Sequence, residues 1–254
     1  IQGTNGVIHV IDQVLLPGDA PKNIVETAMA DEQFSSLVSA LSKADLVSAL
    51  EGDGPFTVFA PTDQAFANLL SDLGVSSLDE VPVDQLEPIL LYHVVSGKVM
   101  SGDLSTGYVS TLSAGPNSTN TTLLAEVNEG VTLNGSSNVT AADIEATNGV
   151  IHVIDEVLLP PNVVDIAINN SNFSILVDAV VKAELASTLS GDGPFTVFAP
   201  TNDAFEALFD QLGINGVDDL TKEDLVPILQ YHVVSGNVRS GDLSSGTVST
   251  LNGD

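Results

Sequence analysis

The sequence predicts an α+β fold that occurs twice along the chain. In each copy the first half carries apolar residues at helical spacing, and the second half carries β-rich segments separated by turn residues. The eleven residues GDGPFTVFAPT stand at Gly52–Thr62 and again at Gly191–Thr201, 139 positions later. This order of elements favours helices gathered at one end of a mainly antiparallel sheet.

The repeat extends beyond that motif. YHVVSG at Tyr92–Gly97 recurs at Tyr231–Gly236 with the same offset, and TNGVIHVID at Thr4–Asp12 recurs at Thr147–Asp155, 143 positions later. Matching blocks in one order indicate tandem units. We expect three segments: residues 1–17 as the closing strand of a preceding repeat, residues 23–160 as a complete domain, and residues 162–254 as a second domain that lacks its C-terminal strands.

The helical half of the first repeat begins with one apolar stripe at i, i+3, i+4 and i+7, formed by Phe34, Leu37, Val38 and Leu41. Asp31 precedes this stripe as a candidate N-cap, and the GDGP segment ends the helical region. A further helix is expected over Asp63–Leu70 with Thr62 as its N-cap. Another is expected over Val83–Tyr92.

Strands are predicted where β-branched and aromatic residues gather. FTVFA at Phe56–Ala60 has the composition of a short buried strand. Leu123–Val127 and Val131–Leu133 flank a turn and predict a hairpin. Val139–Ala146 and Val150–Leu159 flank Thr-Asn-Gly, which predicts a second hairpin.

The charge balance excludes some classes of partner. The chain has 34 acidic and 6 basic residues, for a net charge of −28. Such a field repels nucleic acid and anionic membrane surfaces, so we expect neither as a partner. The apolar runs are too short for a membrane-spanning helix, so direct membrane insertion is not expected. There is no cysteine, which excludes disulfides and thiolate metal sites.

Three motifs, in this order, resemble the fasciclin family. Its first signature segment is matched by TVFAPTDQAF at Thr57–Phe66 and TVFAPTNDAF at Thr196–Phe205. Its Tyr-His motif is matched twice, by Tyr92 with His93 and by Tyr231 with His232. Its second signature segment is matched by NGVIHVIDQVLLP at Asn5–Pro17 and NGVIHVIDEVLLP at Asn148–Pro160.

The resemblance implies a wedge-shaped β-sandwich with flanking helices at one end. It also implies an extracellular or cell-surface protein that mediates adhesion. In animal members of the family, the region around the Tyr-His motif is linked to integrin contact. The candidate binding residues are therefore Tyr92, His93, Tyr231 and His232. The expected partners are other copies of the chain or further fasciclin repeats, and cell-surface or matrix proteins or glycans.

The sequence does not favour an enzyme. No G-x-S-x-G elbow is present, and neither H-E-x-x-H nor a calcium-loop pattern occurs, so no catalytic residue, metal site or cofactor is expected. His9 and His152 are read either as catalytic bases or as buried residues bonded to a backbone carbonyl, and the second reading is favoured. His93 and His232 follow a helix, where an imidazole bonds the last carbonyls.

Six N-x-[ST] sequons are candidate glycosylation sites: Asn117, Asn120, Asn134, Asn138, Asn169 and Asn172.

Together these patterns favour an acidic, extracellular adhesion or structural scaffold, with the possibility of head-to-tail filaments in which a strand of one unit completes its neighbour. The alternative is a ligand- or glycan-binding domain, or less favourably a hydrolase, that uses a cleft near the Tyr-His motif.

Overall fold

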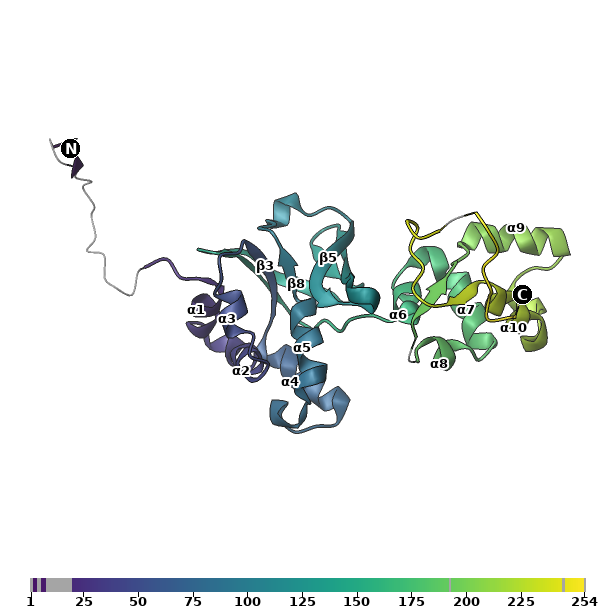
Figure 1. Ribbon diagram of the computed structural model, residues 1–254, viewed down its shortest axis with the longest axis horizontal. Helices are drawn as coiled ribbons and strands as arrows, with labels where there is room; N and C mark the ends of the chain where they lie inside the picture. The colour runs from purple at the N-terminus through teal and green to yellow at the C-terminus, as the bar shows by residue number, and fades with distance from the viewer. Residues whose placement is uncertain (1, 4–5, 8–19, 192, 244, 254) are drawn as a thin grey trace.

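Two lobes lie in series in the structure, a computed structural model that describes residues 2–3, 6–7, 20–191, 193–243 and 245–253 (Figure 1). Residues 23–160 form the first lobe and residues 162–253 the second, and we call them the first and second repeat. The closing strand expected at residues 1–17 lies largely outside the described residues. Of that segment, β1 (Gln2–Gly3) and β2 (Gly6–Val7) are described, and they pair antiparallel.

Side-chain caps set where the helices of the first repeat begin. Asn23 makes a capping box with Glu26 at the start of the first helix, and Thr62 caps the fourth. Asp31 caps a 3₁₀ turn that leads into the second helix, not that helix itself. The helices are α1 (Ile24–Met29), α2 (Ser35–Lys43), α3 (Val47–Leu50), α4 (Asp63–Leu73) and α5 (Val83–Tyr92). The last of these has the predicted bounds.

Seven strands of the first repeat pair into a closed ring. In chain order they are β3 (Phe56–Pro61), β4 (Val94–Ser96), β5 (Gly107–Ala114), β6 (Asn120–Val127), β7 (Val131–Leu133), β8 (Ser137–Ala146) and β9 (Gly149–Ile154). Only β3 and β9 run parallel to each other; the other pairs are antiparallel. The α+β prediction is confirmed, and the expected sandwich is closed at its edges because Val95 of β4 pairs with Thr111 of β5.

The predicted strand Val150–Leu159 is shorter than expected and ends at Ile154. Its parallel partner β3 ends at Pro61, where the chain turns into α4, so nothing continues the ladder. The backbone N–H of Leu158 instead donates to His93 Nε2 at 2.8 Å.

One buried amide ties the β8–β9 turn to the helices. Asn148 is 9% exposed, and its Oδ1 accepts from the backbone N–H of Ile24 at 2.9 Å. Its Nδ2 donates to the carbonyls of Leu50 at 2.7 Å and Gly52 at 3.0 Å. Because buried polar groups need partners, this side chain fixes β9 against α1 and α3.

The second repeat reproduces the helices of the first and keeps its own apolar core. Its elements are α6 (Val163–Ile168), α7 (Ser174–Lys182), α8 (Ala186–Leu189), β10 (Phe195–Val197), α9 (Asn202–Leu212), α10 (Lys222–Tyr231) and β11 (Val233–Ser235). The strands β10 and β11 form a two-stranded sheet. Within residues 162–253, as far as these are described, no strand pairs with the other edge of β10.

Candidate functional site

Tyr92 is a fully buried link between α5 and the strands of the first repeat. It is 0% exposed, and its hydroxyl donates to the carbonyl of Thr122 in β6 at 2.8 Å. The same hydroxyl accepts from Nδ2 of Asn134, in the turn after β7, at 3.1 Å. Burial raises the pKa of Tyr92 to about 12. The Tyr92 side chain therefore links α5 to the sheet through hydrogen bonds.

His93 follows at the end of α5 and is 2% exposed. Its Nδ1 lies 2.8 Å from the carbonyl of Ile89, and its Nε2 accepts from the backbone N–H of Leu158 at 2.8 Å. This pattern requires a neutral ring with the proton on Nδ1. Burial lowers the pKa of His93 to about 4. The predicted bond to the last carbonyls of the helix is confirmed.

We expect the stability of the first repeat to fall as the pH drops from 6.5 to 4. The pKa of His93 is lower in the folded state, about 4 against an ordinary 6.5, so unfolding takes up a proton in this window. Its contribution is fully present above pH 6.5 and is lost as the pH falls through 4. Since one pKa unit is worth about 1.4 kcal/mol, the loss from His93 is about 3 kcal/mol.

An NMR titration of the histidine Cε1–H signals of the full chain tests this prediction, with a His93→Gln variant to identify the His93 signal. We expect the His93 signal to keep its neutral shift until the pH approaches 4. A midpoint near 6.5 would contradict the buried, neutral assignment.

The Tyr-His motif of the second repeat is more exposed to solvent than that of the first. Tyr231 is 56% exposed, and its ring lies edge-on to that of His232 with the ring centroids 6.5 Å apart. His232 is half-buried, and its Nδ1 keeps the bond to the carbonyl of Ile228 at 2.8 Å. The four candidate binding residues therefore form two pairs, one buried and one accessible.

A cluster that the sequence did not reveal joins Ser101, Asp143 and His152. The Ser101 hydroxyl donates to Asp143 Oδ2 at 2.5 Å, and its backbone N–H donates to Oδ1 at 2.7 Å. These hydrogen bonds lower the pKa of Asp143. Asp143 lies in a bulged part of β8, where the register with β9 shifts, and no local sequence pattern marks that bulge.

The hydrogen bonds within this cluster do not suit nucleophilic catalysis. His152 is 0% exposed; its Nδ1 accepts from the backbone N–H of Asp143 at 3.3 Å, and its Nε2 lies 2.9 Å from the carbonyl of Val99. Both ring nitrogens are thus bonded to backbone groups, and the Ser101 hydroxyl bonds the carboxylate of Asp143 and not the imidazole. The predicted buried, carbonyl-bonded role of His152 is confirmed, while His9 lies outside the described residues.

The sequons differ in accessibility. Asn120, Asn138 and Asn172 are exposed, whereas Asn134 and Asn169 are half-buried. The Asn134 amide is held by Tyr92. The Asn138 amide donates to the carboxylate of Asp155 at 3.1 Å. Asn117 lies in a 3₁₀ turn, and its side chain is outside the described part of the structure.

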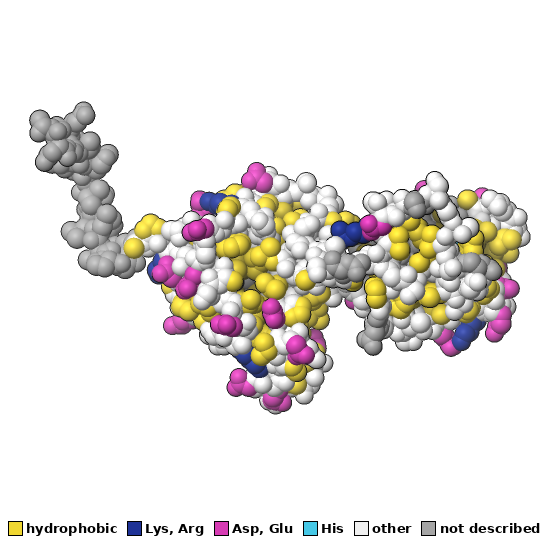
Figure 2. Space-filling model, viewed as in Figure 1, with side chains coloured by type: hydrophobic (Ala, Val, Ile, Leu, Met, Phe, Trp, Pro, Cys, Tyr) yellow, Lys and Arg dark blue, Asp and Glu magenta, His cyan; other side chains and the backbone are white. Residues whose placement is uncertain are grey.

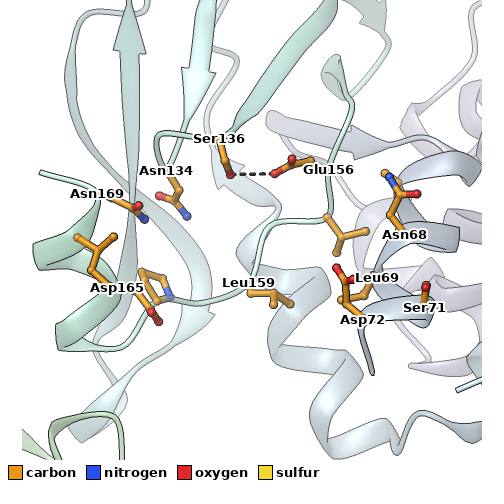
Figure 3. A pocket seen from close by; sticks show the side chains of 14 residues that line it. Asn68, Leu69, Ser71, Asp72, Asn134, Ser136, Glu156, Leu159, Asp165 and Asn169 are labelled. Atoms are coloured by element: carbon orange, nitrogen blue, oxygen red, sulfur yellow. Dashed lines mark hydrogen bonds between the residues drawn. The ribbon is translucent and has the colours of Figure 1, made fainter. Parts of the chain in front are cut away.

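A pocket of about 660 Å³, lined by both polar and apolar side chains, lies where the two repeats meet (Figure 3). Its walls come from α4, the β7–β8 turn, the segment after β9, and α6. Amides and carboxylates line it, among them Asn68, Asp72, Asn134, Glu156, Asp165 and Asn169. Neither Lys nor Arg is among its lining residues. Asn134, which lines the pocket, also donates a hydrogen bond to the hydroxyl of Tyr92.

In the described part of the chain, no three His, Asp or Glu side chains gather in a way that could hold a metal ion. None of the described helices has the length and apolar character needed to cross a membrane.

Relatives of the chain match it over nearly its whole length or over a little more than half of it. Periostin from Homo sapiens is 34% identical over 254 residues, which is 96% of this chain and 28% of periostin. Transforming growth factor-beta-induced protein ig-h3 from Sus scrofa is 32% identical over 247 residues, 96% of this chain and 34% of that protein. Protein sll1483 from Synechocystis is 45% identical over 143 residues, 56% of this chain and 76% of that protein. The chain thus spans about a third or less of the first two relatives.

A solved FAS1 domain pair from the insect cell adhesion molecule fasciclin I aligns with a TM-score of 0.43 and 18% identity, over 78% of this chain and 68% of that one. The fasciclin domain model matches residues 32–160 and again residues 171–254, which together make up most of the sequence. The chain therefore belongs to the fasciclin family and carries two of its domains in tandem.

Proposed function

We propose that this protein is an extracellular or cell-surface adhesion or structural scaffold, in which fasciclin repeats in series present surfaces to matrix proteins, cell-surface proteins or glycans. Family membership across both repeats carries the proposal. The strongly acidic balance supports it, since a net charge of −28 keeps such a surface away from nucleic acid and anionic lipid (Figure 2).

We infer a non-enzymatic role. His152, which lies beside Asp143, the carboxylate that Ser101 bonds, has both ring nitrogens bonded to backbone groups. His93 is buried and bonded at both nitrogens in the same way. Neither ring is available to accept a proton from a substrate.

Glycosylation is proposed at the sequons whose side chains are exposed, Asn120, Asn138 and Asn172. A glycan on Asn134 would replace the hydrogen bond of its amide with Tyr92. A glycan on Asn169 would enter the pocket between the repeats. These two half-buried sites are therefore weaker candidates than Asn120 and Asn172, while a glycan on Asn138 would replace the bond of its amide to Asp155.

We further propose that chains assemble head to tail into filaments. A contact that joins one end of a molecule to the other end of the next does not close on itself, so it produces an open fibre. Negative-stain electron microscopy of the native protein, with sedimentation at low and high salt, tests the idea. Filaments whose repeat matches one or two domains are expected; discrete monomers in every condition would contradict it.

The pocket between the repeats supports a second candidate function, the binding of a glycan or another neutral polyhydroxyl ligand. Amide and carboxylate side chains such as Asn68 and Asp72 supply both donors and acceptors there. A glycan array followed by Asn68→Ala and Asp72→Ala would test it. Saturable binding that both changes abolish would favour this function, and binding that survives both would place the ligand elsewhere.

A further inference from the structure

The dipeptide Asn-Gly occurs five times in the chain, and asparagine is a chemically labile residue. Its side-chain amide is lost when the backbone nitrogen of the next residue attacks Cγ. Glycine in the next position favours this attack because it has no Cβ to obstruct the approach. The five asparagines are Asn5, Asn134, Asn148, Asn215 and Asn252. Asn5 lies outside the described residues, so the structure distinguishes the other four.

Two of these amides are held by other elements of the first repeat. Asn148 is 9% exposed, and its amide bonds backbone groups of the helical region through both its oxygen and its nitrogen. Asn134 is half-buried; its Oδ1 accepts from the N–H of Leu124 at 3.1 Å, and its Nδ2 donates to the hydroxyl of Tyr92 at 3.1 Å. In both cases the side chain must first leave its partners, so the fold protects it.

Asn215 is held much less firmly. It is exposed, in the loop between α9 and α10 of the second repeat (Figure 1). Within the described part of the chain, its Nδ2 donates to Oδ2 of Asp219 at 3.2 Å, and its Oδ1 accepts from no group. The one partner of this amide is therefore an exposed side chain of the same loop.

The exposure of Asn215 is a property of this loop in both repeats. Ser76 is its counterpart in the first repeat, 139 positions earlier, and is exposed although strands β3 to β9 are all present there. The backbone bond of the loop is also the same. The N–H of Ser76 donates to Glu80 at 3.0 Å, and that of Asn215 donates to Asp219 at 2.8 Å.

Asn252 is exposed like Asn215, but the nitrogen that follows it is bonded differently. The N–H of Gly253 donates to the carbonyl of Thr250 at 3.0 Å. The N–H of Gly216 makes no hydrogen bond with any residue that the structure describes. The attacking nitrogen is therefore available at Gly216 and occupied at Gly253.

We propose that Asn215 is a site of spontaneous deamidation in the folded protein. The nitrogen of Gly216 gives its proton to water and attacks Cγ of Asn215, and Nδ2 leaves as ammonia with a proton from the solvent. Water then opens the five-membered imide. Opening at one carbonyl yields aspartate; opening at the other yields isoaspartate, in which the backbone runs through Cγ. Water is the only co-reactant, and nothing is oxidised or reduced.

The product changes the electrostatics of the loop. Hydrogen bonds from the backbone and the side chain of Asn215 lower the pKa of Asp219. Deamidation replaces the donor Nδ2 with a second carboxylate, so a hydrogen bond becomes a repulsion between like charges. Lys182 holds the same loop through the carbonyls of Val217 and Asp218, both at 3.0 Å. We therefore expect the 3₁₀ turn Val217–Asp219 to become more mobile, while the lysine keeps the loop attached to α7.

Mass spectrometry of the full chain, incubated at mildly alkaline pH, tests the proposal. Cleavage after glutamate releases residues 207–223, whose only asparagine is Asn215. Deamidation at Asn215 should be at least about tenfold faster than at Asn134 and Asn148, which react only through local opening. In urea the three sites should react at similar rates, because they share the Asn-Gly dipeptide. Equal rates in the folded chain, or no product at Asn215, would overturn the proposal.

Two variants assign the reaction to this dipeptide. Gly216→Ala should slow it by about tenfold or more, since a Cβ obstructs the attack. The fold tolerates this change, because the φ of Gly216 is 168° and an added Cβ meets nothing within 4 Å. Asn215→Ser introduces the residue of the first repeat and should abolish isoaspartate in residues 207–223. An unchanged rate in Gly216→Ala would overturn the mechanism.

Asn215→Asp reproduces the charge of the product. Its amide exchange at Val217, Asp218 and Asp219 should be faster than in the unchanged chain, and exchange in α9 should stay the same. Asn215→Ser is the matched control, because it removes the amide without adding a charge. Equal exchange in the two variants would overturn the proposed electrostatic effect on the loop.

Discussion

Replacing Tyr92 with Ala should destabilise the first repeat by about 4 kcal/mol, the range measured when large aromatic side chains are removed from cores. The ring is fully buried, and its hydroxyl bonds Thr122 and Asn134. The change leaves a cavity at the junction of α5 with the sheet. It also removes the hydroxyl that bonds the carbonyl of Thr122 and the amide of Asn134, which adds to the cost.

Tyr231→Ala is the matched control, because Tyr231 ends α10 as Tyr92 ends α5 but is 56% exposed. A surface change of this kind should cost about 0.5 kcal/mol. Amide hydrogen exchange on the full chain separates the repeats: Tyr92→Ala should lower protection in β6 and β9, and Tyr231→Ala should leave protection in α9 nearly unchanged. Similar losses in both repeats would contradict the assignment of one buried and one open motif.

Tyr92→Phe isolates the hydroxyl. It keeps the ring volume and removes only the hydrogen bonds to Thr122 and Asn134. The expected loss is about 1–2 kcal/mol, between the wild type and the alanine variant. A loss as large as that of Tyr92→Ala would mean that the hydrogen bonds, and not the packing, dominate the role of Tyr92.

The elements that the sequence predicted best are those with strong local signals. The helix Val83–Tyr92 was predicted with its observed bounds, and Thr62 caps α4 as expected. The strand β5 was missed because its inward face carries the buried polar residues Thr111 and Ser113, which hide the alternation of apolar and polar residues. The hydroxyl of Thr111 is satisfied by Thr121 of the neighbouring strand, a contact that no local pattern reveals.

The candidate site was predicted in composition but not in geometry. The Tyr-His motif was identified, yet its burial depends on Thr122 and Leu158, which lie 30 and 65 residues further along the chain. The Tyr-His motif is buried in the first repeat and exposed in the second because different strands lie beside it. The sequence of the motif is the same in both repeats, so it cannot predict this difference. The cluster of Ser101, Asp143 and His152 depends in the same way on a bulge in β8.

Gly149→Ala is expected to destabilise the first repeat by about 4 kcal/mol, a size that single substitutions reach only through a specific steric or polar conflict. A Cβ at this position would lie 2.0 Å from the carbonyl oxygen of Phe56 and 2.8 Å from Cδ1 of Ile24. The first of these atoms is backbone of β3. It cannot retreat without opening the parallel β3–β9 ladder, in which Phe56 pairs with Gly149 itself.

The control for this substitution is Gly130→Ala, at the exposed turn between β6 and β7, where an added Cβ meets nothing within 4 Å. Urea unfolding of the full chain should show a change within about 0.5 kcal/mol for the control. For Gly149→Ala, amide exchange should show lost protection in β3 and β9, while α9 and α10 of the second repeat keep theirs. That outcome would place the closing strand at the centre of the first repeat's stability, and unchanged protection in β9 would refute it.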